Sequence, residues 1–446
     1  MNIRRLKPGA FVELECRHFV AEGLGLSYFT EESLKEKFKP HVFFIWGVLP
    51  GERFIARLAQ VKSKAAHGVL ARIDELPGAL AGEGSFAHEI WALHNLAEDR
   101  AKPACDHYLL CGGCRMQHMS YERTLYYKEA WLQSQLERNK VEVSALEFHS
   151  LPEETRWHYR NHVQVHINKS GTYGFYEPIS YRTRAFPEHG CLIFNEKSLR
   201  ASFPRYAVEV RAARIRRNVD GNAVFTVLNA KEESQTLARY SIAWPPGRMI
   251  DIDFPINAFF QANLRALPYW LDTIAEYFSR SGIKNPRVLE LFSGFGFISR
   301  MQALVRPIQV MAMDILSPEQ VAAVRFEEAG SRLADNFTAN YRKIDLFLPE
   351  RIPTALQNEV REFAPEVLLI NPPRAGLLPG TWQKLREHAL AGFHGPIIYS
   401  SCDAATMARD LAVFASEGYR CEEMRAFDFF PWTHHFETVS YLTWAQ

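Results

Sequence analysis

The sequence lacks long apolar segments. No uninterrupted apolar run in its 446 residues approaches the ~20 residues that a membrane-spanning helix needs. The first eight residues, Met1 to Pro8, carry charge, and no apolar stretch follows them as it would in a signal peptide. These two absences argue against a membrane protein or a secreted one. They predict a cytoplasmic protein without a membrane partner.

The sequence also has little net charge and few cysteines. Its 52 Lys and Arg residues nearly balance its 51 Asp and Glu residues, which leaves a formal charge of +1. Any affinity for a polyanion must therefore come from local clusters of basic residues. Seven cysteines in a reducing compartment indicate thiolate chemistry or ligation of a metal or cluster, rather than disulfides.

The chain is too long for one ordinary hydrophobic core. It is 47% hydrophobic and 23% charged, which is typical of a globular protein. The usual domain size predicts about three domains. We place them at residues 1–75, 76–255 and 256–446.

The first of these segments predicts a small β-barrel. Residues 11–16 and 53–58 alternate between apolar and polar, residues 41–46 are apolar, and glycines and prolines separate them. The segment resembles a TRAM domain, a small OB-like RNA-binding module, at Gly9 to Leu14, Ala21 to Gly25 and Leu49 to Glu52. The resemblance implies RNA contact, and a barrel that binds nothing is the alternative. Residues 76–100 predict a linker.

Three cysteines lie close together after the linker. They are Cys105, Cys111 and Cys114, with two glycines between the last pair that let the backbone turn tightly. Tetrahedral zinc sites and iron–sulfur clusters both need four such ligands. Cys191, which follows a glycine, is the candidate for the fourth. The spacing alone leaves zinc and [4Fe–4S] equally open. The helical pattern over residues 121–136 predicts a packing helix.

The remainder of the middle segment predicts a basic, aromatic sheet. Residues 159–167 and 171–176 alternate cleanly. Arginines that suit phosphates, and aromatic rings that suit splayed bases, are interleaved here. This composition favours single-stranded RNA, whereas a solvated face with ordinary sheet aromatics is the alternative. The residues concerned are Arg156, Trp157, Tyr159, Arg160, Tyr173, Phe175, Tyr176, Tyr181, Arg182, Arg184, Arg211, Arg214, Arg216 and Arg217.

The last segment carries the pattern of a cofactor-binding α/β sheet. An apolar strand over residues 288–292 leads to Gly294 and Gly296, whose turn would let the backbone approach a ligand. The third glycine of the dinucleotide fingerprint is absent, so S-adenosylmethionine (SAM) fits at least as well as NAD. Asp314 and Asp345 end two further strands, and an acid in such a place commonly binds ribose hydroxyls. Residues 366–370 predict another strand, which runs into Asn371-Pro372-Pro373-Arg374.

A reactive cysteine is predicted at the end of a further strand. The apolar run from Ile397 ends in Ser400-Ser401-Cys402, and a helical pattern follows. Open α/β sheets bind ligands beyond the carboxyl ends of their strands, so Cys402 stands where a nucleophile would stand. An inert buried thiol is the alternative, because free cysteines are usually core residues.

These motifs together resemble the SAM-dependent RNA 5-methyluridine methyltransferases, nearly from end to end. The TRAM-like segment and the cysteine set are similar to the iron–sulfur ribosomal RNA enzymes of the RlmD type rather than to the transfer RNA enzymes of the TrmA type. The resemblance also rests on residues 257–263, the glycine loop, residues 371–377, the Cys402 strand and residues 435–439. The resemblance implies a Rossmann-like methyltransferase domain after an OB-like barrel and a β-rich iron–sulfur domain.

The resemblance also implies the cofactors and the site residues. It implies a [4Fe–4S] cluster on the four cysteines. It also implies RNA as the partner, with ribosomal RNA favoured. The sequence carries no oligomeric signal, so a monomer is the default expectation, and we infer no obligate protein partner. The implied SAM contacts are Gln261, Phe292, Asp314, Asp345 and Asn371, beside Gly294 and Gly296. The family usually has aspartate at position 371 and asparagine at position 297, where this chain has Asn371 and Phe297.

The chemistry assigns one role to each of two side chains. We expect Cys402 to add to C6 of uracil, which makes C5 electron-rich, and Glu437 to remove the C5 proton afterwards. His434 and His435 are rival bases, and Arg374 would position the base or a phosphate. Two other functions stay open: methylation of an amino group, which the Asn371-Pro372-Pro373 sequence also suits, and RNA binding without turnover.

Overall fold

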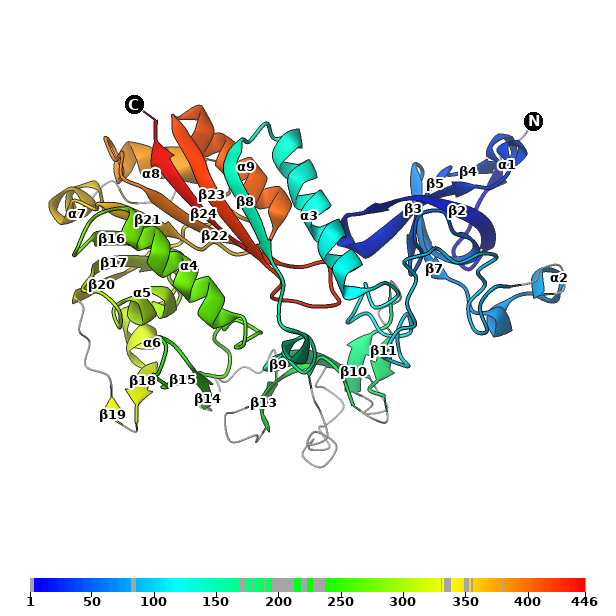
Figure 1. The fold of residues 1–446 in the computed structure, drawn as a ribbon, viewed down its shortest axis with the longest axis horizontal. Coiled ribbons are helices and arrows are strands. Elements are labelled where there is room, and N and C mark those ends of the chain that lie inside the picture. Colours follow the sequence, from blue (N-terminus) through cyan, green and yellow to red (C-terminus); the bar gives the residue numbers. More distant parts are fainter. Residues whose placement is uncertain are drawn as a thin grey trace.

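The computed structural model describes residues 4–81, 86–168, 173–178, 180, 182–187, 190–194, 212–217, 223–227, 237–329, 331–332, 338–348, 353, 356–378 and 380–445. A closed five-stranded barrel forms one end of the molecule, and an eight-stranded sheet with flanking helices forms the other (Figure 1). In the described part of the chain, no helix is long and apolar enough to cross a bilayer.

The barrel confirms the prediction of an N-terminal OB-like fold. Its strand order is β2-β3-β5-β7-β6, and β2 and β3 alternate between buried and partly buried positions, as a closed barrel requires. Gly25 allows close packing, because a Cβ there would overlap the side chains of Val48 and Cys16. The strands are β2 (Phe11–Val20), β3 (Leu24–Phe29), β5 (Val42–Trp46), β6 (Arg53–Val61) and β7 (Ala65–Leu70), beside the short strands β1 (Arg4–Arg5) and β4 (Phe38–Lys39) and the helices η1 (Ala21–Gly23), α1 (Glu32–Lys37), η2 (Ile73–Glu75) and α2 (Gly78–Ala81).

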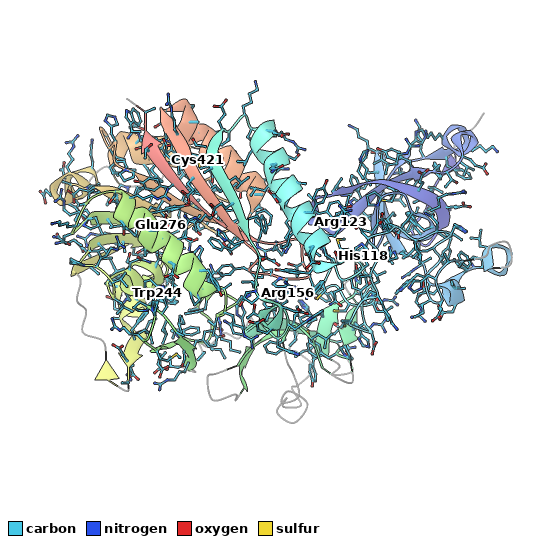
Figure 2. All side chains as sticks on the ribbon, viewed as in Figure 1. His118, Arg123, Arg156, Trp244, Glu276 and Cys421 are labelled. Carbon is cyan, nitrogen blue, oxygen red and sulfur yellow. The ribbon has the colours of Figure 1, made fainter. Side chains whose placement is uncertain are left out.

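The segment that carries the first three cysteines is fixed to this barrel. Tyr108 and Leu109 belong to the apolar core of the barrel, and a Cβ on Gly47 would overlap Leu109. The Tyr108 hydroxyl lies 2.5 Å from Nδ1 of His118, which is fully buried. Figure 2 shows His118 beside the barrel, close to Arg123 of the following helix α3 (Tyr121–Arg138). Ser120 caps this helix, because its hydroxyl accepts a hydrogen bond from the Arg123 amide.

A five-stranded antiparallel sheet occupies the middle of the chain. Two residues proposed for RNA contact are instead part of the interior. The Tyr159 side chain is 3% exposed, and Arg216 is fully buried. Arg182 and Arg184 pair with Glu177, while Tyr181 and Arg211 lie outside the described residues. The sheet order is β11 (Thr183–Ala185), β10 (Tyr173–Tyr176), β9 (His162–Ile167), β12 (Ala212–Arg217) and β13 (Ala223–Val227), and the 3-10 helix η3 (Glu153–Thr155) precedes it.

The eight-stranded sheet is the doubly wound sheet predicted from the sequence. Its first five strands are parallel. The strand order reverses at β16, because β17 and β20 follow on one side of it and β21 and β22 follow on the other. This reversal is a topological switch point. The last three strands are β24, which is antiparallel to β22, then β23 and β8. The order is β20 (Thr338–Lys343), β17 (Gln309–Asp314), β16 (Arg287–Leu291), β21 (Val367–Ile370), β22 (Ile397–Ser401), β24 (Glu437–Trp444), β23 (Tyr419–Phe427) and β8 (Val143–His149).

Helices cover both faces of this sheet. One face packs against α3, α7, α8 and α9, and the other packs against α4, α5 and a four-stranded sheet. Strands β21 and β22 are buried on both faces, which explains their continuous apolar sequences. The helices are α4 (Leu267–Arg280), α5 (Phe297–Gln302), α6 (Pro318–Ala322), α7 (Leu356–Phe363), α8 (Thr381–His388) and α9 (Ala404–Ser416), and the small sheet contains β14 (Leu237–Ile242), β15 (Ile250–Pro255), β18 (Arg325–Glu328) and β19 (Ser331–Arg332).

Candidate active site

Cys402 and Glu437 lie at facing ends of two paired strands. Ser401, the last residue of β22, pairs with Thr438 of β24, and the Thr438 hydroxyl donates to the Ser401 carbonyl at 3.1 Å. Cys402 is the next residue after Ser401, and Glu437 is the residue before Thr438. The antiparallel register therefore brings the thiol and the carboxyl together at the carboxyl end of β22. Asp403 then caps α9 by accepting a hydrogen bond from the Thr406 amide at 2.9 Å.

The two groups share a poorly solvated environment. Burial, and then the charge of Glu437, raise the pKa of the Cys402 thiol to about 12, and Arg374 opposes this shift. Burial raises the pKa of Glu437 from its ordinary value of 4.5 to about 8, again against the effect of Arg374. The Glu437 side chain is only 3% exposed. A carboxyl with a pKa near neutrality can accept and release protons at physiological pH.

The two histidines beside Glu437 are poor candidates for the base. Burial lowers the pKa of His434 to about 3, helped by nearby cations of which Arg115 is the first. Burial and then His434 lower the pKa of His435 to about 2. Groups with such low pKa values are weak bases at neutral pH. The His435 Nε2 atom instead lies 3.4 Å from the guanidinium of Arg374.

The loop from Asp428 to Phe436, which we call the active-site loop, contains His434 and His435 and leads directly into Glu437. A buried ion pair fixes its start, with Nζ of Lys128 2.5 Å from Oδ1 of Asp428, and Lys128 also donates to the Phe430 carbonyl. The Asn263 amide donates to the Phe429 carbonyl at 3.0 Å. The loop is thus attached to α3 and to the segment that contains Gln261.

The same loop is attached to the central part of the chain. The Tyr159 hydroxyl donates to the Pro431 carbonyl at 3.1 Å. The backbone amides of Arg115 and Met116 both donate to the Trp432 carbonyl, at 3.0 and 3.1 Å. Trp432 has a φ of 65°, a left-handed conformation that side-chain-bearing residues adopt only when the surroundings enforce it. The cysteine segment therefore fixes the backbone five residues before Glu437.

A second group of predicted residues lies at the carboxyl ends of β16 and β17. Oδ2 of Asp314 accepts a hydrogen bond from the Gly294 amide at 2.9 Å, so the acid and the glycine loop are adjacent. Gly294 and Gly296 have φ values of 56° and 74°. A Cβ on Gly296 would overlap the Tyr341 hydroxyl, whereas the corresponding space at Gly294 is open. The loop can therefore approach a ligand closely at Gly294.

Phe292 and Asp345 both lie next to Phe347. Phe292 has a φ of 57°, and its ring meets that of Phe347 edge-on with centroids 5.6 Å apart. Oδ1 of Asp345 accepts a hydrogen bond from the Phe347 amide at 3.0 Å, which brings Asp345 to this ring pair. Asn371 follows β21, and its amide donates to the Leu291 carbonyl at 3.3 Å.

Gln261 lies in a buried segment next to the glycine loop. It is 7% exposed, and its backbone carbonyl accepts a hydrogen bond from the Asn161 amide group at 2.7 Å. The preceding ring, Phe260, lies 5.2 Å from that of Phe297 at the start of α5. The structure thus gathers the seven residues proposed for the cofactor around one edge of the sheet.

Glu290 is a candidate residue to which the sequence analysis assigned no role. It is fully buried inside β16, and burial raises its pKa to about 8. Ser299 donates a hydrogen bond to Oε2, while Oε1 has no partner among the described residues. The signal in the sequence was an acidic residue within the apolar run from Val288 to Leu291, since a buried carboxyl is costly unless it is used.

The four cysteines line one small, largely apolar pocket of about 30 Å³. Burial raises the pKa values of Cys105, Cys111 and Cys114, and the nearby Cys191 and Cys105 further raise that of Cys111. Within the described residues, however, no three His, Cys, Asp or Glu side chains are grouped closely enough to hold a metal ion. The cysteines therefore share a pocket without forming a preassembled ligand set.

Comparison with known proteins shows that this chain is similar to RNA methyltransferases. Residues 247–444 match the family model described as tRNA (Uracil-5-)-methyltransferase. An uncharacterized RNA methyltransferase of Leptospira interrogans is 25% identical, over 93% of this chain and 92% of the relative. The 23S rRNA (uracil(1939)-C(5))-methyltransferase RlmD of Shewanella woodyi is 24% identical over 90% of each chain.

The fold also resembles that of a solved structure. The crystal structure of Pyrococcus abyssi tRNA (uracil-54, C5)-methyltransferase, in complex with S-adenosyl-L-homocysteine, aligns with a TM-score of 0.60. The alignment covers 96% of this chain and 99% of the archaeal chain at 19% identity. At this identity the likeness concerns the fold.

Proposed function

We propose that this chain is a SAM-dependent RNA uracil-C5 methyltransferase, and that it methylates C5 of a uridine in 23S ribosomal RNA through a covalent adduct on Cys402. The observation that carries the proposal is the thiol of Cys402 beside the buried carboxyl of Glu437, at the carboxyl end of a strand. The RlmD relative favours ribosomal RNA as the substrate.

Cys402 acts first. Its thiolate forms a bond to C6 of uracil, and the electron pair of the C5–C6 double bond moves onto C5 and the O4 carbonyl as an enolate. Because burial keeps the pKa of this thiol near 12, the free thiol is mostly protonated, and the reaction depends on losing that proton within the bound complex. Arg374, which opposes the pKa shift, favours the thiolate.

Glu437 acts last. Its carboxylate removes the proton from C5 after methylation, the C5–C6 double bond forms again, and Cys402 leaves as a thiolate. Cys402 carries no negative charge either as the protonated free thiol or in the adduct, so it does not oppose the ionised form of Glu437, which the charge of Arg374 favours.

The residues around the glycine loop would hold the methyl donor. When it is bound, SAM supplies the methyl group as an electrophilic sulfonium. Asp314 and Asp345 offer carboxylates for ribose hydroxyls, and Gly294 leaves the backbone accessible. Phe292, Gly296, Gln261 and Asn371 complete the proposed set. Phe292 contributes an aromatic face.

The four cysteines would hold a [4Fe–4S] cluster. The donor set fits, because four thiols line one apolar pocket in which thiolates need a compensating positive charge. A bound cluster would supply that charge and join Cys191 to the segment from Cys105 to Cys114. Since Arg115 and Met116 bind the Trp432 carbonyl, the proposed role of the cluster is structural support for the active-site loop.

The proposal is tested by deleting the gene and analysing the RNA. Nucleoside mass spectrometry with site mapping should show one or more 5-methyluridines missing from 23S ribosomal RNA, and complementation should restore them. Transfer RNA is the second candidate substrate, because the matching family model is named for it. If the methyl group is missing from transfer RNA alone, the substrate is transfer RNA and not ribosomal RNA. A methyl group lost from a nitrogen atom would overturn the proposal.

A further inference from the structure

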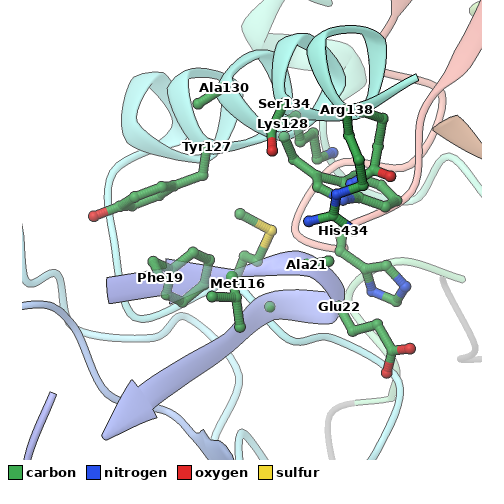
Figure 3. A pocket seen from close by; sticks show the side chains of 14 residues that line it. Phe19, Ala21, Glu22, Met116, Tyr127, Lys128, Ala130, Ser134, Arg138 and His434 are labelled. Carbon is green, nitrogen blue, oxygen red and sulfur yellow. The ribbon is translucent and has the colours of Figure 1, made fainter. Parts of the chain in front are cut away.

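A pocket of about 280 Å³ lies between the barrel and helix α3 (Figure 3). The turn from β2 to β3 forms one wall with Phe19 and Glu22. One side of α3 forms the opposite wall with Tyr127, Trp131 and Arg138, and His434 of the active-site loop completes it. Its size is at the lower end of the range for small-ligand pockets, and it suits one planar base rather than a peptide.

The lining combines aromatic faces with a cationic rim. The rings of Phe19 and Tyr127 pack against each other, with centroids 4.4 Å apart at 40°. Trp131 is half-buried and meets Phe436 edge-on, with centroids 5.8 Å apart. Arg138 is exposed in the last turn of α3 and makes no ion pair with any described residue. Glu22 is paired with Arg115 at 3.5 Å, so its charge is offset.

The pocket is also close to the chemistry. His434 lines it, and Glu437 follows three residues later, so the two Cα atoms are at most about 11 Å apart along the chain. A base held in the pocket and a base held at Cys402 can therefore belong to one strand, a few nucleotides apart. Single-stranded RNA is commonly recognised by stacking unpaired bases on aromatic side chains while cations bind the backbone.

We propose that this pocket binds the base of a nucleotide near the target uridine, with the adjoining phosphate on Arg138. The proposal rests on the proposed function for the identity of the polymer. It gives the barrel and α3 a joint role: they hold the strand at a second point, so that the target base is presented to Cys402 in one register.

Two variants test the pocket without relying on activity. Ser134 lies on its α3 wall and is exposed, so Ser134→Trp should fill the space without removing any packing. Gln133→Trp is the matched control, since Gln133 is an exposed neighbour outside the lining. Tyr127→Leu removes one aromatic wall, and Tyr126→Leu controls for it because Tyr126 is 56% exposed outside the pocket.

The measurement is equilibrium binding of the full-length protein to ribosomal RNA from a strain that lacks it, with SAM binding measured in parallel. Ser134→Trp and Tyr127→Leu should each raise the Kd for RNA about tenfold, as expected for a lost base stack. The Kd for SAM, and both controls, should stay within twofold of the wild type. Unchanged RNA affinity in both pocket variants would overturn the proposal. The pocket would then bind a protein or no ligand.

The binding readout separates this inference from the proposed function. Weakened RNA binding in the variants of a protein that transfers no methyl group would support the pocket and refute the reaction. Normal methyl transfer and normal binding in both variants would refute the pocket alone.

Discussion

At the scale of single residues, the buried carboxyl of Glu437 has a cost and a use. Its pKa of about 8 means that the folded protein holds a proton which the unfolded chain releases above its ordinary pKa of 4.5. Glu437 therefore does not lower the free energy of unfolding below pH 4.5, and it lowers it progressively as the pH rises from 4.5 towards 8. The same proton exchange near neutrality suits a base that must act after methylation.

Replacing Glu437 with glutamine should separate these two effects. The Glu437→Gln variant should accumulate the covalent protein–RNA adduct, because nothing removes the C5 proton, and turnover should fall by at least about 100-fold. A denaturing gel of the reaction with RNA and SAM detects the adduct. Glu422→Gln, an exposed site on the neighbouring strand β23, should turn over normally. Normal turnover without adduct in Glu437→Gln would refute the base assignment.

The same variant should change stability in a pH-dependent manner. Glutamine cannot ionise, so the variant should gain about 2–4 kcal/mol over the wild type at pH 8 and much less at pH 5. Urea unfolding at the two pH values measures the difference. A constant difference would mean that the carboxyl is not held in its protonated form.

The sequence alone predicts one of the two proposed catalytic residues from its local pattern. Cys402 is predicted because a strand buried on both faces is continuously apolar, and this run ends at the thiol. Glu437 came only from the family resemblance, since the antiparallel pairing of β22 with β24 leaves no local signal. Glu290 was visible as an acid in an apolar strand, but its unpartnered oxygen required the structure.

At the scale of elements, the active-site loop depends on α3. The Lys128 and Asp428 side chains are 1% and 0% exposed, and 300 residues separate them in the sequence. Burial lowers the pKa of Lys128, and Asp428 opposes this shift. A pair of this kind is costly to break, because the remaining charge is left without a partner.

Breaking this ion pair should unfold the loop region. Lys128→Met should lower the free energy of unfolding by about 3–5 kcal/mol, and adding Asp428→Asn should restore much of it. Denaturant unfolding measures both variants. Lys384→Met is the control, because its pair with Glu387 is exposed, and it should cost less than about 1 kcal/mol. Equal costs for the two lysines would refute the role given to the buried pair.

The elements themselves were largely predictable, but their partners were not. The helix expected at residues 121–136 is α3, and the strands expected near 309–313 and 366–370 are β17 and β21. Their periodicity is local. Strand β8 lies within the range expected for the central domain, yet it forms the edge of the large sheet by pairing in parallel with β23. Only the chain's path in three dimensions determines such a pairing.

At the scale of the whole molecule, the cysteine segment connects the three parts of the chain. Tyr108 and Leu109 pack in the barrel, the cysteines face the central sheet residue Phe175, and Arg115 binds the active-site loop. The domain limits at residues 75 and 255 remain predictions. The arrangement indicates why a cluster here would matter for a reaction that takes place elsewhere.

The metal content of the protein should identify the proposed cluster. Anaerobically purified protein should contain about four iron and four sulfide ions per chain. Cys105→Ser and Cys191→Ser should lose most of both, and their unfolding should become less cooperative. Cys421→Ser should retain both ions, because that buried thiol lies in β23 outside the cysteine pocket. One zinc ion per chain in place of iron would refute the cluster.

The most direct test of the central claim is the site of the protein–RNA bond. Ribosomal RNA containing 5-fluorouridine should trap the enzyme in the presence of SAM, because the fluorine on C5 cannot be removed as a proton is. Mass spectrometry of the digested complex should then find a methylated fluorouracil nucleotide on the peptide that contains Cys402. Cys402→Ala should form no complex, whereas Cys421→Ala should form it normally. A nucleotide attached to any other residue, or 5-methyluridine produced by Cys402→Ala, would contradict the account.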